Sequence, residues 1–302
     1  MTIAITGATG FVGQAALDIG KGKNCAMRAL TRRPQPPREG VAWVEGSLDD
    51  AASLARLVGG ADAVIHIAGL TSAVRPEEFD RVNVEGTARV IEAACAAGTK
   101  RLVFVSSLSA REPGLSVYGG SKNQAEALVR DSALDWTIVR PPAVYGPRDS
   151  EMFELFRAAR SGIVPLPPPG RASLIQVEDL ARLLVALASE PDCFGTVLEP
   201  DDGRAGGYAH KELARLIAQA VGRRRVFAPH LPKAVLMAAA RADRLVRGRK
   251  AKLTPDRAGY MAHPDWVCDP AKSPPAAFWT PRFEGAEGLA ATAAWYREQG
   301  WL

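Results

Sequence analysis

The chain has 302 residues, which allows one large or two modest domains and excludes a mini-protein that needs disulfides or a metal to fold. Its net charge of +5 is unevenly placed, because residues 222–252 alone hold ten basic residues and one acidic residue. The positive charge therefore belongs to one local surface, which disfavours a general nucleic-acid-binding function.

The cysteines give no sign of a metal site or a disulfide framework. All four stand 70 or more residues apart in the sequence, without a neighbouring group of histidines. The chain does not begin with a signal-peptide pattern, and its apolar stretches are far shorter than the ~18–20 residues that span a bilayer. We therefore expect no metal, no transmembrane segment and a cytoplasmic location.

Short β-rich runs alternate with helix-forming stretches along the first half of the chain. Continuous apolar strands alternating with helices are typical of a doubly wound parallel sheet. We predict strands at residues 3–6, 26–31, 42–45, 63–68, 101–106 and 136–139. We predict helices at residues 10–19, 48–58, 76–97 and 119–131.

The alternation loosens after residue 147, where several prolines interrupt the chain. A predicted helix at 177–189 and a predicted strand at 196–199 are suited to rejoining the sheet. The sequence thus predicts an α/β protein with a nucleotide-binding domain at residues 1–148, to which 172–199 return. Residues 149–302 are expected to form a smaller, mainly helical substrate-binding region.

A glycine-rich turn directly follows the first predicted strand and opens the first predicted helix. Gly7 permits a tight turn, Gly10 allows the backbone to approach a pyrophosphate, and Gly13 allows close packing of the helix. The helix start, with Phe11 and Val12, offers free N–H groups to an anion. An ordinary Gly-rich turn is the alternative, but the order of strand, turn and helix predicts a Rossmann dinucleotide site.

The end of the second predicted strand indicates which dinucleotide is bound. An NAD site usually has an acidic residue about 20 residues after the glycines, whereas NADP needs cations for its 2′-phosphate. No carboxylate lies between Asp18 and Glu39, and Arg32 and Arg33 stand in that interval. Guanidinium groups suit bidentate phosphate contacts. The sequence therefore predicts NADP over NAD, and a solvated loop is the alternative reading of the two arginines.

Three residues near the fifth strand form a candidate catalytic set. Ser107 follows that strand, and Tyr118 and Lys122 are spaced to share one face of a helix. Lowering the pKa of a phenol from ~10 to near neutrality requires about 4 kcal/mol, and an adjacent ammonium has the right charge. Ser107 is expected to donate a hydrogen bond to the substrate oxygen. An ordinary helix pair is the alternative reading of Tyr118 and Lys122.

Together with further motifs, these residues make the chain resemble the extended branch of the short-chain dehydrogenase/reductase superfamily. That branch contains NAD(P)-dependent epimerases, dehydratases and reductases. The further motifs are VIHIAG at 64–69, NVEGT at 83–87 and VRPPAVYGP at 139–147, and the resemblance covers nearly the whole length.

The resemblance assigns roles to individual residues. It implies that Ser107, Tyr118 and Lys122 are catalytic, and that Lys122 also orients the cofactor ribose. It also implies cofactor contacts for residues outside the glycine turn, namely Leu48, Ala68, Pro141 and Val144. Ser47 departs from the family pattern, because relatives often carry an Asp there that contacts adenine.

The expected activity is NADP-dependent hydride transfer between the nicotinamide and a carbonyl or alcohol carbon of a small-molecule substrate, with Tyr118 as general acid/base. Two alternatives stay open: a nucleotide-sugar epimerase or dehydratase, and a non-catalytic NADP-binding structural or sensing protein. The segment between Ser107 and Tyr118 is shorter than in many sugar-nucleotide epimerases, which slightly disfavours the first. A homodimer is expected only by analogy with relatives.

The basic segment at 222–252 contains a predicted helix from residue 232 to 247. Its cations gather on one arc, at Lys233, Arg241, Arg244 and Arg247. Its expected packing face is the opposite arc, formed by Val235, Ala239, Ala242 and Val246. The simplest interpretation is a helix that packs through its apolar face and exposes these cations to solvent. The alternatives are attraction of an anionic substrate or of the cofactor phosphates, and weak contact with an anionic membrane surface.

Overall fold

The computed structural model describes residues 1–23, 25–73, 75–248 and 253–302. The chain forms two compact units, one made of residues 1–140 and 180–198 and the other of residues 141–179 and 199–302. The sequence places the boundary after residue 148 and the returning segment at 172–199. Residues 249–252 of the predicted basic segment lie outside the described residues.

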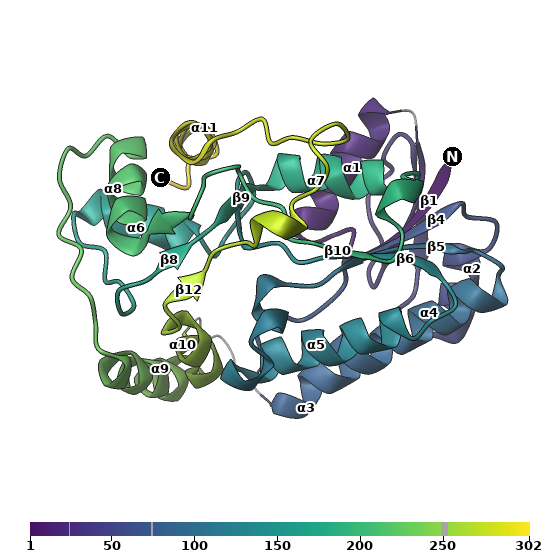
Figure 1. Cartoon of the computed structure of the whole chain (residues 1–302), viewed down its shortest axis with the longest axis horizontal. Coiled ribbons are helices and arrows are strands. Elements are labelled where there is room, and N and C mark those ends of the chain that lie inside the picture. The colour runs from purple at the N-terminus through teal and green to yellow at the C-terminus, as the bar shows by residue number, and fades with distance from the viewer. Residues whose placement is uncertain (24, 74, 249–252) are drawn as a thin grey trace. The chain divides into compact units, whose positions relative to one another are not determined.

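A seven-stranded sheet forms the centre of the first unit, and all its neighbouring strands are parallel (Figure 1). In spatial order the strands are β10 (Thr196–Leu198), β6 (Asp135–Val139), β5 (Arg101–Val105), β4 (Ala63–His66), β1 (Thr2–Thr6), β2 (Ala26–Thr31) and β3 (Val41–Glu45). The strand order reverses between β1 and β4, and doubly wound sheets bind ligands beyond the carboxyl ends of the strands at such a point. The predicted fold class is confirmed.

Helices cover both faces of this sheet (Figure 1). On one face lie α1 (Phe11–Gly22) and α7 (Val177–Leu187), and on the other lie α2 (Ala51–Val58), α4 (Gly86–Ala96) and α5 (Val117–Arg130). Every residue of β4 and β5 is buried, which explains why these strands read as continuous apolar runs. The core beneath α2, α4 and α5 includes Leu54, Val64, Val90, Leu102, Phe104 and Val129.

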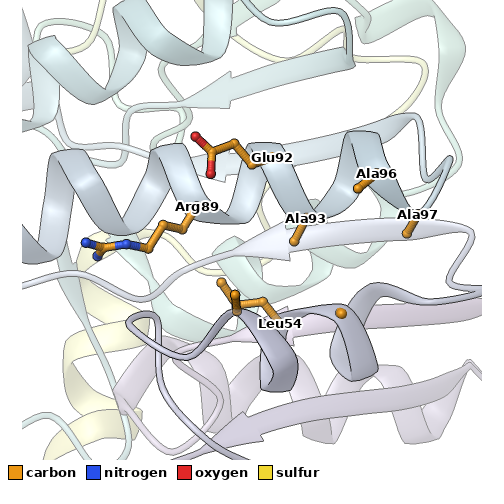
Figure 2. A pocket seen from close by; sticks show the side chains of 8 residues that line it. Leu54, Arg89, Glu92, Ala93, Ala96 and Ala97 are labelled. Carbon is orange, nitrogen blue, oxygen red and sulfur yellow. The ribbon is translucent and has the colours of Figure 1, made fainter.

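A shallow apolar groove of about 360 Å³ lies between α2 and α4 (Figure 2). Leu54 and Ala93 line it, together with the charged side chains of Arg89 and Glu92. Because α4 runs antiparallel to the strands that it connects, its last residues lie toward the amino ends of those strands. The groove contains none of the predicted site residues.

The helix predicted at 76–97 is divided into three segments. It consists of α3 (Pro76–Phe79), a π-helical turn (Asp80–Glu85) and α4. The π turn buries Asn83, whose side chain bonds to the backbone of Leu70. Such turns are rare, and the sequence predicted one continuous helix here instead.

The second unit combines helices with short strands. Its helices are α6 (Phe153–Ser161), α8 (His210–Ala220), α9 (Lys233–Arg247), α10 (Pro255–Met261) and α11 (Gly285–Glu298). Strand β7 (Ala143–Tyr145) pairs with β9 (Leu174–Gln176), and β8 (Arg171–Ala172) lies between β11 (Tyr208–Ala209) and β12 (Asp265–Trp266). The region predicted as mainly helical is therefore mixed. Strands of two or three residues are too short to show a periodic pattern in the sequence.

Helix α9 packs through a different face from the predicted one. Leu236 and Ala240 are buried against Ala258 of α10, whereas Val235 and Val246 are 47% and 84% exposed. The prediction of the packing face was wrong because burial of the large Leu236 side chain removes more apolar area from water than burial of alanines.

Within the described part of the chain, no helix combines the length and apolar character needed to cross a membrane.

Candidate nucleotide-binding and catalytic site

The glycine turn after β1 is packed too closely to hold side chains. Gly7 has a φ of +71°, and a Cβ atom there would lie 2.6 Å from the backbone nitrogen of Ala68. A Cβ atom at Gly13 would lie 2.6 Å from the Cα of Ala8. The turn therefore needs glycine both for its backbone conformation and for its contact with the segment after β4.

The first turn of α1 is suited to an anion. Gly10 is the N-cap residue, no side chain caps the helix, and its first turn contains no acidic residue. Gly10 is exposed, and Phe11 and Val12 are half-buried. Free N–H groups and the positive end of the helix dipole favour a phosphate at this position. The turn and the helix start thus fit the pyrophosphate of a dinucleotide, with the exposed Gly10 where the backbone would approach it.

Arg32 and Arg33 follow β2 at the same edge of the sheet as the glycine turn, because β2 is parallel to β1. Both residues are exposed, and among the described residues no hydrogen bond or ion pair engages either guanidinium. Arg38 differs, since it donates to Asp18 at 2.6 Å and to Gln14 at 2.7 Å. The arrangement leaves Arg32 and Arg33 available for the predicted 2′-phosphate.

A buried hydrogen-bond network lies behind the glycine turn, and its residues are far apart in the sequence. The backbone N–H of Ala68 donates to Thr6 Oγ1, which lies 2.6 Å from Nδ1 of His66. Nε2 of His66 lies 3.1 Å from Oγ1 of Thr87, and that hydroxyl donates to the carbonyl of Asn83. Since the Thr87 proton is already donated, His66 Nε2 must carry a hydrogen and Nδ1 must accept one. The network thereby holds His66 as a neutral imidazole.

This network makes the stability of the protein depend on pH. Burial, together with the charge of Lys122, lowers the pKa of His66 to about 3 from its usual 6.5. Below pH 6.5 the unfolded chain binds a proton that the folded chain does not, so the stabilisation is complete above that pH and is lost as the pH falls toward 3. At about pH 4.5 we expect the loss to be about 2–3 kcal/mol, measured by urea unfolding.

The His66→Gln variant should lack this component of the pH dependence. Its unfolding free energy should therefore change less between neutral pH and about pH 4.5 than that of the wild-type protein. Nitrogen NMR of the wild-type protein gives a second readout, because the His66 ring should stay neutral at this pH. Protonation of His66 near its ordinary pKa would contradict the prediction.

Lys122 lies at the carboxyl end of β5. Its ammonium donates to the carbonyl of Val105 at 2.7 Å and stands 4.4 Å from the centre of the Phe104 ring. Burial lowers the pKa of Lys122 to about 8, although the charge of Glu126 partly opposes this shift. At neutral pH Lys122 is therefore still mainly protonated and can place a positive charge at the end of this strand.

Tyr118 lies one helical turn before Lys122 on α5. Ser116 caps this helix by accepting a hydrogen bond from the backbone N–H of Gly119 at 2.9 Å. A Cβ atom at Gly119 would lie 2.7 Å from the carbonyl oxygen of Ser109, so the start of α5 packs closely against the segment that follows Ser107. The Tyr118 ring is half-buried, with its centre 6.1 Å from that of Phe79.

Ser107 is positioned with its proton free to donate. Its Oγ accepts hydrogen bonds from the backbone N–H of Ser109 at 3.2 Å and from the Ser109 hydroxyl at 2.9 Å. A hydroxyl that accepts two hydrogen bonds still has its own proton to give. The structure thus brings the candidate set of Ser107, Tyr118 and Lys122 to one end of β5.

Asn83 connects the π-helical turn with the candidate catalytic helix. Its Oδ1 accepts from the backbone N–H of Leu70 at 2.7 Å, and its Nδ2 donates to the Ser121 hydroxyl at 2.9 Å. Ser121 in turn donates to the carbonyl of Tyr118 at 2.8 Å. The first turn of α5 is therefore fixed by a side chain that the sequence alone did not place.

A buried ion pair supports α5 one turn beyond Lys122. Glu126 is fully buried and accepts hydrogen bonds from Ser106 and Arg130 and two from Arg140. Burial alone would raise the pKa of Glu126, but the hydrogen bonds and charges of Arg140, Ser106 and Arg130 outweigh it and hold the pKa below its usual value. The strand end and the helix are thereby joined through one carboxylate.

Removing this carboxylate should strongly destabilise the protein. Glu126→Ala removes two charge-assisted hydrogen bonds from the buried guanidinium of Arg140, which should cost about 3–5 kcal/mol. The control is Arg130→Gln, which removes a partner whose side chain is 36% exposed and should cost at most about 1 kcal/mol. Urea unfolding measures both changes, and equal losses in the two variants would contradict the account.

The remaining predicted cofactor residues lie in both units. Leu48 follows β3 and packs against α4, since a Cβ atom at Gly86 would lie 2.8 Å from its Cδ1. Ala68 contacts the glycine turn. Pro141 and Val144 belong to the second unit, where Val144 pairs with β9, so their cofactor contact stays a prediction.

Among the described residues, no group of three or more His, Cys, Asp and Glu residues is arranged to hold a metal ion.

The doubly wound sheet, the tight glycine turn and the uncapped helix start together define a dinucleotide-binding protein of the Rossmann class. A family model described as NAD(P)H-binding matches residues 7–191, more than half of the chain. The chain belongs to the extended short-chain dehydrogenase/reductase superfamily, within the NAD-dependent epimerase/dehydratase family. It is therefore an NAD(P)-dependent enzyme of the reductase and epimerase type.

Individual relatives match most of the chain or nearly all of it. The chain is 39% identical to a ceramide reductase of Caulobacter vibrioides, over 99% of this chain and 96% of that one. It is 27% identical to a UDP-glucose 4-epimerase of Vibrio cholerae, over 73% and 76% of the two chains. The structure of a human epimerase family protein with NADPH covers 97% of this chain and 99% of its own, with a TM-score of 0.76 and 20% identity. Other structures with this fold contain NAD, so the fold itself does not select the dinucleotide.

Proposed function

We propose that the protein is an NADP-dependent reductase that converts a carbonyl group of a small-molecule substrate into an alcohol. The observation that carries this proposal is the position of Lys122, whose ammonium is held at the end of β5, one helical turn from Tyr118. Ser107 follows the same strand with a proton available to donate. A general acid, a cation and a hydrogen-bond donor are the groups that carbonyl reduction requires.

Each of the three residues has a separate role in the proposed reaction. The bound dinucleotide supplies the hydride that adds to the carbonyl carbon. Ser107 donates a hydrogen bond to the carbonyl oxygen, and Tyr118 gives that oxygen its phenolic proton as the alcohol forms. The Lys122 ammonium stabilises the phenolate left on Tyr118. Proton uptake from solvent then restores Tyr118 for the next turnover.

NADP is proposed over NAD because the two exposed arginines follow β2 and no carboxylate occupies the interval from 19 to 38. The glycine turn and the first turn of α1 would hold the pyrophosphate, and Arg32 and Arg33 would hold the 2′-phosphate. Lys122 would orient the ribose, as the family resemblance implies.

A ceramide-type lipid that carries a reducible carbonyl is the proposed substrate class. Its support is the 39% identity with a ceramide reductase over nearly the whole of both chains. The test is to incubate the protein with NADPH and a ketone-bearing ceramide, and to identify the product by mass spectrometry. A product heavier by two hydrogens is expected. The substrate proposal is wrong if the protein reduces other ketones but leaves this lipid unchanged.

The second candidate function is epimerisation or dehydration of a nucleotide sugar. It is favoured by the 27% identity with a UDP-glucose 4-epimerase and by the fact that a Tyr and Lys pair serves both reactions. An epimerase returns the hydride to its own substrate, so UDP-glucose would be converted with no net change in NADPH absorbance. The same assay with both substrates distinguishes the two candidates.

A further inference from the structure

Helix α9 has a large apolar face that no other described element of the second unit covers. It buries Leu236 and Ala240 against α10, which lies beside it in the second unit (Figure 1). The opposite face points away from this contact. At about 100° per residue that face covers about 140° of the helix surface.

Only aliphatic residues occupy this outward face. Its members are Ala234, Val235, Ala238, Ala239, Ala242, Leu245 and Val246, and all seven are exposed. Leu245 is 86% exposed and Val246 is 84% exposed. A continuous exposed patch of this kind marks an interaction surface, since single apolar residues scattered over a surface are ordinary but a full helix face is not.

Exposed cations accompany the apolar face. At about 100° per residue, Arg241 lies about 20° beyond Ala234 at the edge of the face, and Arg244, Lys233 and Arg247 follow farther around the helix; all four are exposed. The acidic residue of the helix, Asp243, pairs with Arg247 at 3.2 Å. Three further exposed arginines, Arg223, Arg224 and Arg225, precede the helix. The helix therefore combines an exposed aliphatic face with exposed cations beside and behind that face.

We propose that α9 binds the surface of an anionic lipid bilayer. Leu245 and Val246 enter the boundary between headgroups and acyl chains, while Lys233 and Arg241 contact the anionic headgroups. An interfacial helix has this division between apolar residues and cations. In a symmetric pairing with a second copy, the same cations would meet like charges. Nucleic acid would pair with the cations but would leave the aliphatic face exposed to water.

The test is flotation of the full-length protein with vesicles. One set contains phosphatidylcholine mixed with phosphatidylglycerol, and the other contains phosphatidylcholine alone. We expect the protein to bind the mixed vesicles, and to bind the neutral vesicles at least about tenfold more weakly. Added salt should weaken binding to the mixed vesicles. Leu245→Gln with Val246→Gln should reduce binding at least about tenfold, whereas Leu245→Met with Val246→Ile should retain it.

A second pair of variants tests the charges. Lys233→Gln with Arg241→Gln should weaken binding to the mixed vesicles about tenfold. The matched control is Lys211→Gln with Arg215→Gln on α8, which removes the same charge from another exposed helix and should leave binding unchanged. Tyr118→Phe should bind like the wild-type protein, so vesicle binding is tested separately from the proposed reaction.

Three results would overturn the membrane proposal. The first is no binding of the wild-type protein to the mixed vesicles. The second is equal binding by the Leu245→Gln, Val246→Gln variant and its Met, Ile control. The third is a stable dimer that the Gln substitutions dissociate, with no vesicle binding by the wild-type protein, which would assign the face to a second copy of this chain.

Discussion

The Tyr118→Phe variant should lose about 10²–10⁴-fold in kcat for carbonyl reduction while binding NADPH as tightly as the wild-type protein. The substitution removes the proton donor and keeps the ring, which lies beside Phe79. The glycine turn is untouched, so the cofactor affinity should not change. Steady-state kinetics measures kcat, and quenching of protein fluorescence on titration with NADPH measures binding.

Tyr145 provides the matched control for this variant. Its hydroxyl is buried and has no hydrogen-bond partner within the described residues. Tyr145→Phe removes an unsatisfied buried polar atom, so it should retain turnover and be at least as stable as the wild-type protein. Near-normal turnover of Tyr118→Phe, or an equal loss in both variants, would refute the role assigned to Tyr118.

Replacing Arg32 and Arg33 together by Ala should raise the KM for NADPH about tenfold to a hundredfold and leave the KM for NADH nearly unchanged. The reason is that only NADPH has the 2′-phosphate that the two guanidinium groups are expected to contact. KM values for both cofactors, measured with one carbonyl substrate, provide the comparison.

Arg38→Ala is the control for the cofactor prediction, because Arg38 is already engaged by Asp18 and Gln14. This variant should change both KM values by the same factor, if at all. A wild-type preference for NADH would overturn the prediction, as would a double variant in which both KM values rise equally.

The parts of the site that the sequence predicted depend on local geometry. A tight turn needs glycine at Gly7 and Gly13, and the four-residue spacing of Tyr118 and Lys122 places both on one helix face. The bounds of β2 follow from a continuous β-rich run. These features depend on neighbouring residues in the chain, so they are visible without the folded structure.

The parts that the sequence did not predict depend on contacts between distant segments. The hydrogen-bond partners of His66 are Thr6 and Thr87, which lie 60 and 21 residues away in the sequence. No local sequence pattern therefore predicts that His66 is a neutral imidazole behind the glycine turn. Asn83 bonds to Ser121 across 38 residues from within a π-helical turn. The packing face of α9 was mispredicted for a related reason, because the helix is apolar on two sides and only α10 decides which side is buried.

Transfer of deuterium from the nicotinamide ring tests the central claim most directly. Purified protein is incubated with NADPH deuterated at the transferred position and with the ketone-bearing ceramide, and product mass and NADPH absorbance are followed together. The account predicts an alcohol that carries deuterium on the former carbonyl carbon, with one NADPH consumed for each alcohol formed. Turnover of any substrate without net loss of NADPH and without deuterium in the product would contradict it.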